Sequence, residues 1–375
     1  MEKLINSLQK NHTLVGMNIL YTDKDHIIDQ KYFGKMDIEN DVDTKANTIY
    51  RIASISMVIV ALGIMKLYDE GKVDIYEDVS KYLGFKLRNP HYPDDKITLE
   101  MIMTQTSSLC DGDEDPNVGY DAVNGPHIYV PLKELLTNPD YKYYSPKTFT
   151  KYKPGEKFLY SNLGCGVLAC IIEHVSGEFY SDYIERVLLR PMGLDASYRP
   201  SQIKNKELIA SLYDYRNGEF VLDRSKDLFL EKEFPVYPLG DNFRGPAGGL
   251  FISPIDLSKI MRLLMNDGTF EGFTYVKEST IKFMKEIHWQ GDSGDPSYKK
   301  KGLQLNLIDG LTKDTLMGHF GCAYGLRSFM LFNNDFGYIS LCNGGHYVET
   351  SDHMIDLHEQ TIKGLIEVSY AGKKN

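Results

Sequence analysis

Short apolar runs bounded by turn residues lie near both ends of the chain, and such runs are typical of β-strands. Residues 14–21 and 26–33 are two of them, and the polar segment Thr22-Asp23-Lys24-Asp25 between them predicts a hairpin. Later runs predict further strands at residues 303–308, 315–320, 326–332 and 337–342. A turn at residues 333–335 joins the last two.

The apolar pattern also predicts two prominent helices. The first starts at Ser54, and because its apolar side chains fall on several faces, it should be buried on all sides. The second, over residues 351–370, is amphipathic and would cover one face of the sheet. Early and late strands must pair, so the middle of the chain is an insertion. We therefore predict an α/β (α+β) fold: an antiparallel sheet flanked by helices, from residues 1–53 and 245–375, with a mostly helical domain at residues 54–244.

The start of the buried helix carries the most informative motif, Arg51-Ile52-Ala53-Ser54-Ile55-Ser56-Met57. It resembles the nucleophile motif of class C β-lactamases, penicillin-binding proteins and related esterases, in which a lysine follows the serine three residues later. Here Ser54 is present, but Met57 stands at the lysine position. Positions three apart share a helix face, so a lysine at position 57 would lie beside the Ser54 hydroxyl and take up its proton. The thioether of Met57 cannot do this.

Three more segments match the same family in the same order. Residues 154–162 hold a Tyr-x-Asn element, Gly318-His319-Phe320-Gly321-Cys322 resembles the Lys-Thr-Gly strand in a His-x-Gly form, and residues 245–257 resemble the Gly-rich turn before it. The resemblance runs from about residue 13 to 345 and implies a β-lactamase/transpeptidase-like fold with the active site in the cleft between the two domains. Departures at Gln105, Phe320 and Cys322 lie near that cleft, so the family's substrate preferences do not carry over.

The resemblance also assigns a role to each site residue. Ser54 would be the nucleophile, and Tyr160 the second base and proton shuttle. The backbone N–H groups of Ser54 and Cys322 would form the oxyanion hole. His319 would be the polar group on the strand edge. The residues that would contact the substrate are Asn162, Gly321 and Cys322.

The loss of lysine at position 57 should slow the chemistry, since general-base assistance is typically worth about 10² to 10⁴ in rate. Tyr160 is a weak substitute, because a phenol with a pKa near 10 needs about 4 kcal/mol to lose its proton at pH 7. The missing lysine cation would also have stabilised the phenolate, so its loss raises the pKa of the phenol. His319 is then the remaining candidate base, with an ordinary pKa of about 6.5.

Composition limits the classes of partner. The chain has 375 residues, of which 42% are hydrophobic, enough for a substantial core. A net charge of -10 argues against a nucleic-acid partner, because phosphate binding needs clustered Lys and Arg. The run Lys299-Lys300-Lys301 is short, and we expect it to lie in a solvated loop.

The sequence predicts neither a metal nor another cofactor. Five cysteines, at positions 110, 165, 170, 322 and 342, form no even disulfide framework and no metal-ligand pattern, and they look like reduced thiols. The amino terminus lacks a signal-peptide pattern, and no stretch reaches transmembrane length. We therefore expect a cytoplasmic protein with a small-molecule or peptide substrate. The oligomeric state is left open.

Three readings of Met57 follow. In the first, the protein is a serine hydrolase that acts on an ester or amide, slowly or with a rearranged base. In the second, it is a pseudoenzyme whose cleft binds a peptide or acyl ligand. In the third, Met57 is not native, because Lys and Met codons can differ by one base. Sequencing the source gene separates the third reading from the other two.

Overall fold

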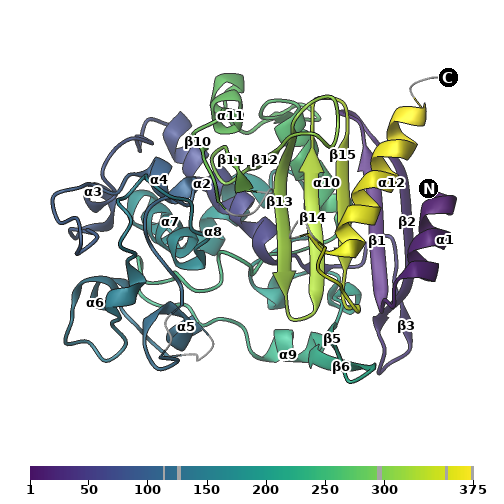
Figure 1. Cartoon of the computed structure of the whole chain (residues 1–375), viewed down its shortest axis with the longest axis horizontal. Helices are drawn as coiled ribbons and strands as arrows, with labels where there is room; N and C mark the ends of the chain where they lie inside the picture. The colour runs from purple at the N-terminus through teal and green to yellow at the C-terminus, as the bar shows by residue number, and fades with distance from the viewer. Residues whose placement is uncertain (113–114, 125–127, 294–297, 351–353, 373–375) are drawn as a thin grey trace.

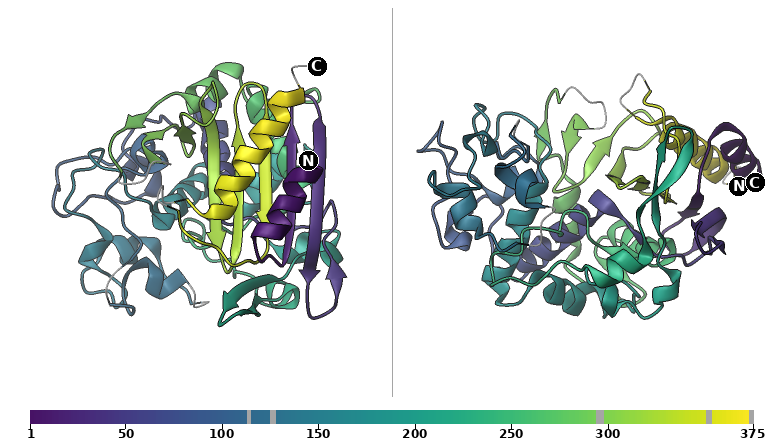
Figure 2. Two further views of the ribbon diagram at one scale, coloured as in Figure 1. Left: turned by 45° about the vertical axis from the view of Figure 1, so that its right-hand side comes forward. Right: turned by 90° about the horizontal axis from the view of Figure 1, so that it is seen from below.

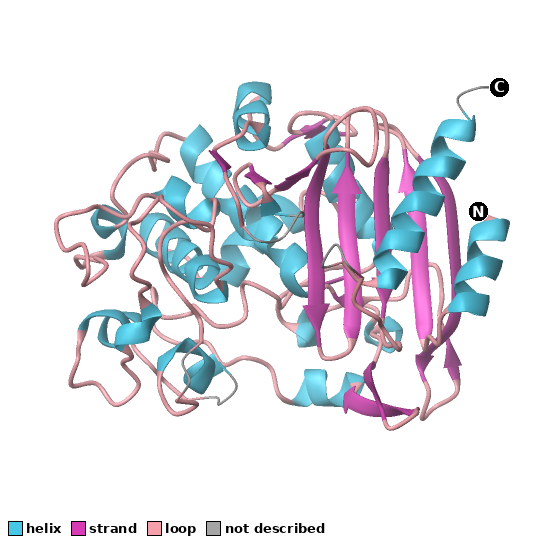
Figure 3. Ribbon diagram, viewed as in Figure 1, coloured by secondary structure: helices cyan, strands magenta, loops and turns pink. Residues whose placement is uncertain are grey.

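The computed structural model describes residues 1–112, 115–124, 128–293, 298–350 and 354–372 (Figure 1). Most of the strands lie in one half of the molecule and most of the helices in the other (Figure 3). The helices between the early and late strands are α2 (Ser56–Asp69), α3 (Ser80–Leu83), α4 (Leu99–Met103), α5 (Gly119–Asn124), α6 (Leu132–Thr137), α7 (Asn162–Ser176), α8 (Tyr180–Ile184), α9 (Lys226–Glu231), α10 (Pro254–Met265) and α11 (Glu278–Lys285). The predicted fold class is confirmed.

One large antiparallel sheet has the strand order β10-β11-β12-β13-β14-β15-β1-β2-β3. Its strands are β1 (Gly16–Thr22), β2 (Ile27–Asp37), β3 (Val42–Asp43), β10 (Trp289–Gln290), β11 (Lys300–Lys301), β12 (Asn306–Ile308), β13 (Leu316–Ala323), β14 (Leu326–Phe332) and β15 (Gly337–Cys342). The shorter strand pairs are β4 (Tyr50–Arg51) with β7 (Phe251–Ile252), β5 (Leu212–Arg216) with β6 (Glu219–Arg224), and β8 (Thr269–Phe270) with β9 (Phe273–Thr274). Every residue of β1 and of β15 is buried, because both strands are covered on two faces.

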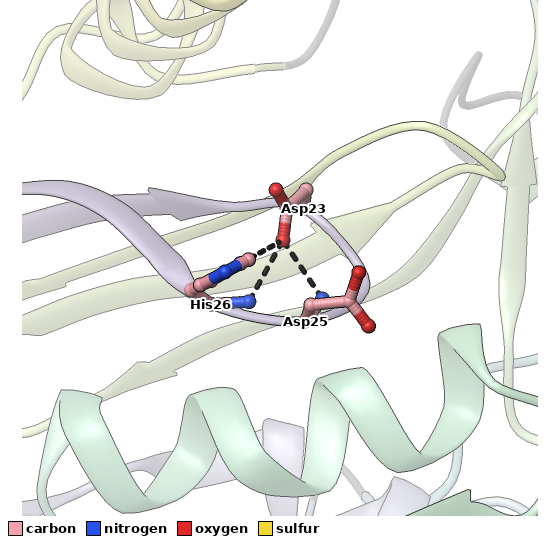
Figure 4. A group of neighbouring side chains, drawn as sticks. All are labelled: Asp23, Asp25 and His26. Carbon is pink, nitrogen blue, oxygen red and sulfur yellow. Dashed lines mark hydrogen bonds and ion pairs between the residues drawn. The ribbon is translucent and has the colours of Figure 1, made fainter.

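The two ends of the chain meet in the middle of this sheet. β1 pairs with β15, so that Asn18 lies opposite Leu341. The prediction that early and late strands pair is therefore confirmed, as is the hairpin of β1 and β2. In its turn, Asp23 Oδ1 accepts hydrogen bonds from the backbone N–H groups of Asp25 and His26, each at 2.7 Å (Figure 4). The carboxylate of Asp23 thus shapes the turn.

Two terminal helices cover one face of the sheet. They are α1 (Glu2–Asn11) and α12 (Asp356–Gly372), which lie side by side over the strands (Figures 1 and 2). Apolar side chains of α1, α12 and the strands form a core between these layers, with Leu8, Phe329 and Leu365 fully buried in it. α10 packs against the sheet through β1, β14 and β15.

The helical half is built around α2, in which every residue from Ser56 to Met65 is buried. This confirms the prediction of a helix buried on all sides. α7 packs against α2 at Gly63, where a Cβ would lie only 2.8 Å from Ile172 Cδ1. Ser161 caps α7, because its Oγ accepts a hydrogen bond from Gly164 N at 3.0 Å. The missing side chain at Gly63 lets α7 pack closely against α2, and the cap satisfies the first turn of α7.

Several predicted boundaries were wrong. β12 begins at Asn306 rather than at 303, because Gln304 has a φ of 56° and bends the chain. β13 runs on to Ala323, three residues beyond the predicted end. The last helix begins at Asp356, and residues 351–353 of the predicted range lie outside the described residues. The division into two domains at residues 53 and 245 stays a prediction.

The prediction of a solvated loop at Lys299-Lys300-Lys301 was also wrong in part. Lys299 is exposed, but Lys301 lies on β11 and has no exposed surface. Strand pairing explains the difference, because β11 hydrogen-bonds to β10 on one side and β12 on the other. All five cysteines are free. Among the helices that the structure describes, none has both the length and the apolar character needed to span a membrane.

Candidate active site

Ser54 lies in a tight turn that the sheet holds in place. The turn is the short 3₁₀ helix η1 (Ala53–Ile55), so α2 begins two residues after Ser54 rather than at Ser54 as predicted. Ala53 has a φ of 51°, a left-handed conformation that costs energy for a residue with a side chain. Two contacts hold the backbone there: Ile52 N donates to Leu250 O at 2.9 Å, and Ser328 Oγ donates to Ile52 O at 3.2 Å.

Gly321 of β13 allows the sheet to approach this turn. A Cβ at position 321 would lie 2.5 Å from Ile52 O and 2.3 Å from Ser328 Oγ, so a side chain would force the strand and the turn apart. The predicted His-x-Gly motif therefore has a steric function at its glycine. It brings the backbone of β13 against the turn that carries Ser54.

Five of the predicted site residues line one cavity of about 460 Å³; they are Ser54, Tyr160, Asn162, Gly321 and Cys322. Ser54, Asn162 and Cys322 also line an adjoining cavity of about 150 Å³. The structure thus brings Ser54 and the end of β13 together at one cavity, and the roles assigned to these residues stay predictions. His319 does not line either cavity, and its side chain is 1% exposed.

Met57 occupies the interior behind Ser54 and has no exposed surface. Its sulfur is a hydrogen-bond acceptor for two side chains: Tyr160 Oη at 3.6 Å and Gln105 Nε2 at 3.3 Å. Tyr160 therefore holds its proton and directs it at Met57 rather than at a base. Sulfur is a weak acceptor and does not take the proton. The methionine thus preserves the packing of the site without supplying the chemistry of a lysine.

The pKa of Tyr160 also indicates that this side chain keeps its proton. Burial raises the pKa of Tyr160 well above its usual value of 10, and the nearby Tyr298 raises it further. A hydrogen bond with Ser54 lowers the pKa but does not offset these effects. Tyr160 is consequently a neutral phenol at pH 7, in hydrogen-bond contact with the candidate nucleophile.

His319 is also poorly suited to accept a proton at neutral pH. Burial lowers its pKa to about 3, and the charge of Lys301 contributes to the shift. His319 Nδ1 lies 2.6 Å from the carbonyl oxygen of Phe320, so Nδ1 carries the proton in the neutral ring. His319 Nε2 is left as a bare acceptor and has no hydrogen-bond partner among the described residues. A base with this pKa takes up protons weakly at pH 7.

Asp111 fixes the end of α7 that faces the cavity, and sequence reasoning missed it. Its carboxylate accepts four hydrogen bonds: from Ser161 Oγ at 2.8 Å, Asn162 N at 2.6 Å, Asn162 Nδ2 at 2.8 Å and Leu163 N at 2.8 Å. A carboxylate is favoured at a helix N-terminus by the exposed N–H groups there. Nδ2 of Asn162 is therefore committed to Asp111, and a part for Asn162 in binding a substrate stays a prediction.

Asp111→Ala is expected to lower the free energy of unfolding by about 2–4 kcal/mol, because hydrogen bonds to a charged group are worth about 1.5–3 kcal/mol each. Chemical denaturation measures the change. Asp94→Ala is the matched control, since Asp94 is exposed. A loss no larger than that of the control would mean that Asp111 does not hold α7 in place.

A second feature missed from the sequence lies beside Ser54. The guanidinium groups of Arg51 and Arg224 flank the ring of Tyr324, at 4.8 and 4.3 Å from its centroid. Burial alone would raise the pKa of Tyr324, but the two arginines lower it below its usual value. Arg51 and Tyr324 line the smaller cavity with Ser54. This side of the site is therefore positively charged, although the whole chain is acidic.

Comparisons with known proteins agree with this fold. Among solved structures, the octameric penicillin-binding protein homologue from Pyrococcus abyssi has a TM-score of 0.74 at 21% identity, over 98% of this chain and 76% of that chain. The D-amino acid amidase from Ochrobactrum anthropi SV3, in complex with L-phenylalanine amide, has a TM-score of 0.72 at 18% identity, over 100% of this chain and 98% of that chain. At these identities the likeness is one of fold.

Among curated proteins, protein flp of Staphylococcus aureus (strain N315) is 28% identical over 207 residues, which is 55% of this chain and 39% of flp. The D-alanyl-D-alanine-carboxypeptidase/endopeptidase AmpH of Escherichia coli (strain K12) is 30% identical over 197 residues, 52% of this chain and 48% of AmpH. The chain thus matches less than half the length of either relative. The model of the family described as Beta-lactamase matches residues 1–355. The chain belongs to the beta-lactamase family.

Proposed function

We propose that this protein is a serine hydrolase that acts on an ester or amide through an acyl-Ser54 intermediate, with its turnover limited by Met57. The observation that carries the proposal is the cavity of about 460 Å³ that Ser54 shares with Tyr160, Asn162 and Cys322. A strained turn held against β13 presents the hydroxyl at that cavity. Strain of this kind persists where the surrounding structure enforces it, and it is frequent at active sites.

The chemistry would proceed in two steps. Ser54 Oγ attacks the carbonyl carbon, and the backbone N–H groups of Ser54 and Cys322 stabilise the resulting oxyanion. Collapse of this intermediate expels the alcohol or amine, which takes up the proton of the Ser54 hydroxyl, and leaves the acyl group on Ser54. Water then releases it as a carboxylic acid and restores the hydroxyl. Arg51 and Tyr324 favour a substrate with an anionic group near the scissile bond.

Hydrolysis of an activated ester tests the proposal. Purified protein incubated with p-nitrophenyl acetate should release nitrophenol at a rate that exceeds buffer and saturates with substrate. The rate should be slow relative to members of the family that carry the lysine, because a general base that typically raises the rate by about 10² to 10⁴ is missing. A rate equal to that of buffer would contradict turnover by this site.

The alternative function is that of a pseudoenzyme that binds a peptide or acyl ligand in the same cavity. The pKa values favour it: Tyr160 is raised well above 10 and His319 is lowered to about 3, so neither is suited to accept a proton at pH 7. Hydrogen-bond donors at the cavity do not depend on the missing lysine. The cytoplasmic location and the type of ligand stay predictions from the sequence.

Thermal shift separates the two functions. A ligand at a hundredfold excess over its Kd stabilises the folded state by about 2.7 kcal/mol, which raises Tm measurably. Boronates need a reactive serine hydroxyl as well as an oxyanion hole, whereas acyl peptides need only the cavity. Stabilisation by both supports the hydrolase, and stabilisation by peptides alone supports the pseudoenzyme. No stabilisation by either would count against both functions.

A further inference from the structure

A further cavity, of about 330 Å³, lies next to the candidate active site. The smaller cavity beside Ser54 lies between this one and the large cavity. It shares Ser54 and Cys322 with the large cavity, and it shares Arg51 and Tyr324 with the further cavity. We call the further cavity the arginine cavity, because Arg51 and Arg224 both line it. A substrate held at Ser54 can therefore extend into it.

Cations outnumber anions around the arginine cavity. Arg51, Arg224 and Lys232 line it, whereas Glu233 is the one carboxylate among its described lining residues. Arg224 Nη1 pairs with Asp223 Oδ1 at 2.9 Å. In the part of the chain that the structure describes, no carboxylate oxygen lies within 4 Å of the side-chain nitrogens of Arg51 or Lys232. The wall of the cavity is therefore net positive, although the whole chain carries a net charge of -10.

A strained turn holds the two arginines around one ring. The guanidinium groups of Arg51 and Arg224 lie 4.8 and 4.3 Å from the ring centroid of Tyr324. Tyr324 has a φ of 53°, a conformation that is rare for a bulky residue and costs energy. The next residue, Gly325, touches β5, because a Cβ at position 325 would lie 1.9 Å from Tyr213 O. The contact between the β13–β14 turn and β5 thus keeps the ring between the two cations.

The remainder of the wall is largely apolar. Phe229 and Phe251 contact each other edge to face, with ring centroids 4.9 Å apart, and both line the cavity with Leu228. Phe251 lies opposite Arg51 in the pair of β4 and β7, so the sheet register places an apolar ring beside a cation. Cavities that combine an apolar lining with a few converging polar groups are typical of sites for small molecules. A ligand that matches this wall has an apolar stem and an anionic end.

We propose that the arginine cavity binds a carboxylate at the far end of the substrate's acyl chain, so that the substrates are esters or amides of short dicarboxylic acids. The inference rests on the proposed acylation of Ser54. A guanidinium group donates two parallel hydrogen bonds to a carboxylate, and the methylene groups of the chain pack on the apolar wall. Arg51 is three positions before Ser54, so their Cα atoms are at most about 11 Å apart. The leaving group has to exit, and the large cavity of about 460 Å³ gives it room.

Binding to the Ser54→Ala protein tests the proposal without turnover. The two ligands are the mono-4-nitroanilide of adipic acid and the same anilide with a terminal amide in place of the carboxylate. In isothermal titration calorimetry the carboxylate should bind at least about tenfold more tightly, because charge-assisted hydrogen bonds are roughly twice as strong as neutral ones. The net charge of the chain would produce the opposite preference, since it repels anions. Equal or weaker binding of the carboxylate would overturn the proposal.

Substitutions in the Ser54→Ala background locate the preference. Arg224→Met keeps an unbranched apolar stem and should reduce the preference for the carboxylate to less than about threefold. Arg216→Met is the matched control and should keep the full preference, because Arg216 belongs to the same hairpin but pairs with Asp214 and lines none of the three cavities. Lys232→Met is the second variant if Arg224→Met does not fold, and it should lower the preference about twofold. Preferences equal to that of the control would overturn the proposal.

Hydrolysis of the corresponding p-nitrophenyl esters by the wild-type protein separates this inference from the proposed function. A value of kcat/KM at least about tenfold higher for the ester with the terminal carboxylate supports both claims. Hydrolysis of the two esters with equal kcat/KM would overturn the assignment of the arginine cavity alone. Tighter binding of the carboxylate without hydrolysis of either ester would overturn the proposed function and support the arginine cavity as a binding site.

Discussion

Met57→Lys is expected to raise the hydrolysis of an activated ester at least about tenfold, and by up to about 10⁴, the usual range of general-base assistance. The new amine would replace a sulfur that lies 3.6 Å from Tyr160 Oη. Gln105 offers an acceptor nearby, because its buried Oε1 has no hydrogen-bond partner among the described residues. The measurement is kcat/KM for p-nitrophenyl acetate at pH 7.5.

Met57→Leu is the control for this substitution, since leucine keeps an apolar side chain of similar size and adds no base. It should leave the rate within about twofold of wild type. A folded Met57→Lys protein with an unchanged rate would show that the site has diverged at more than one residue. The departures at Gln105 and Cys322 would then be the next positions to revert.

Ser54→Ala is expected to abolish both ester turnover and labelling, because among the described residues no other serine or threonine lines either of the two cavities. Removing a nucleophile typically costs several orders of magnitude in rate. Steady-state turnover and intact mass after labelling both report it.

Ser56→Ala provides the matched comparison two residues away. Ser56 is fully buried, and its Oγ accepts a hydrogen bond from Leu250 N at 3.2 Å. Its loss should lower the free energy of unfolding by about 1–3 kcal/mol, since the Leu250 N–H is left unsatisfied. The labelling of Ser54 should continue. Loss of labelling in Ser56→Ala and its retention in Ser54→Ala would reverse the assignment of the nucleophile.

Much of the sheet could be predicted because its strands are short apolar runs with clear turns. β14 and β15 match their predicted bounds, and the hairpin at Asp23 has the turn chemistry of its sequence. β11 could not be predicted in this way, because two lysines form it. The segment is a strand because it pairs with β10 and β12, and this pairing buries Lys301. The local pattern of residues does not show it.

Only those candidate site residues that belong to sequence motifs could be named from the sequence. Ser54, Tyr160 and Cys322 belong to segments with a recognisable order, and the fold brings them to one cavity. Asp111 could not be found, because it reaches Asn162 across 51 positions and no local pattern marks it. The pKa of His319 could not be predicted either, since it depends on burial and on Lys301, which only the folded chain provides.

The central claim is that Ser54 is a reactive nucleophile although Met57 has replaced the base. Intact-mass spectrometry of the wild-type protein after incubation with a fluorophosphonate, followed by peptide mapping, tests it most directly. We expect one adduct per chain, on Ser54. Absence of an adduct after prolonged incubation at pH 8, or an adduct on Ser56 or Cys322 with Ser54 unmodified, would contradict it.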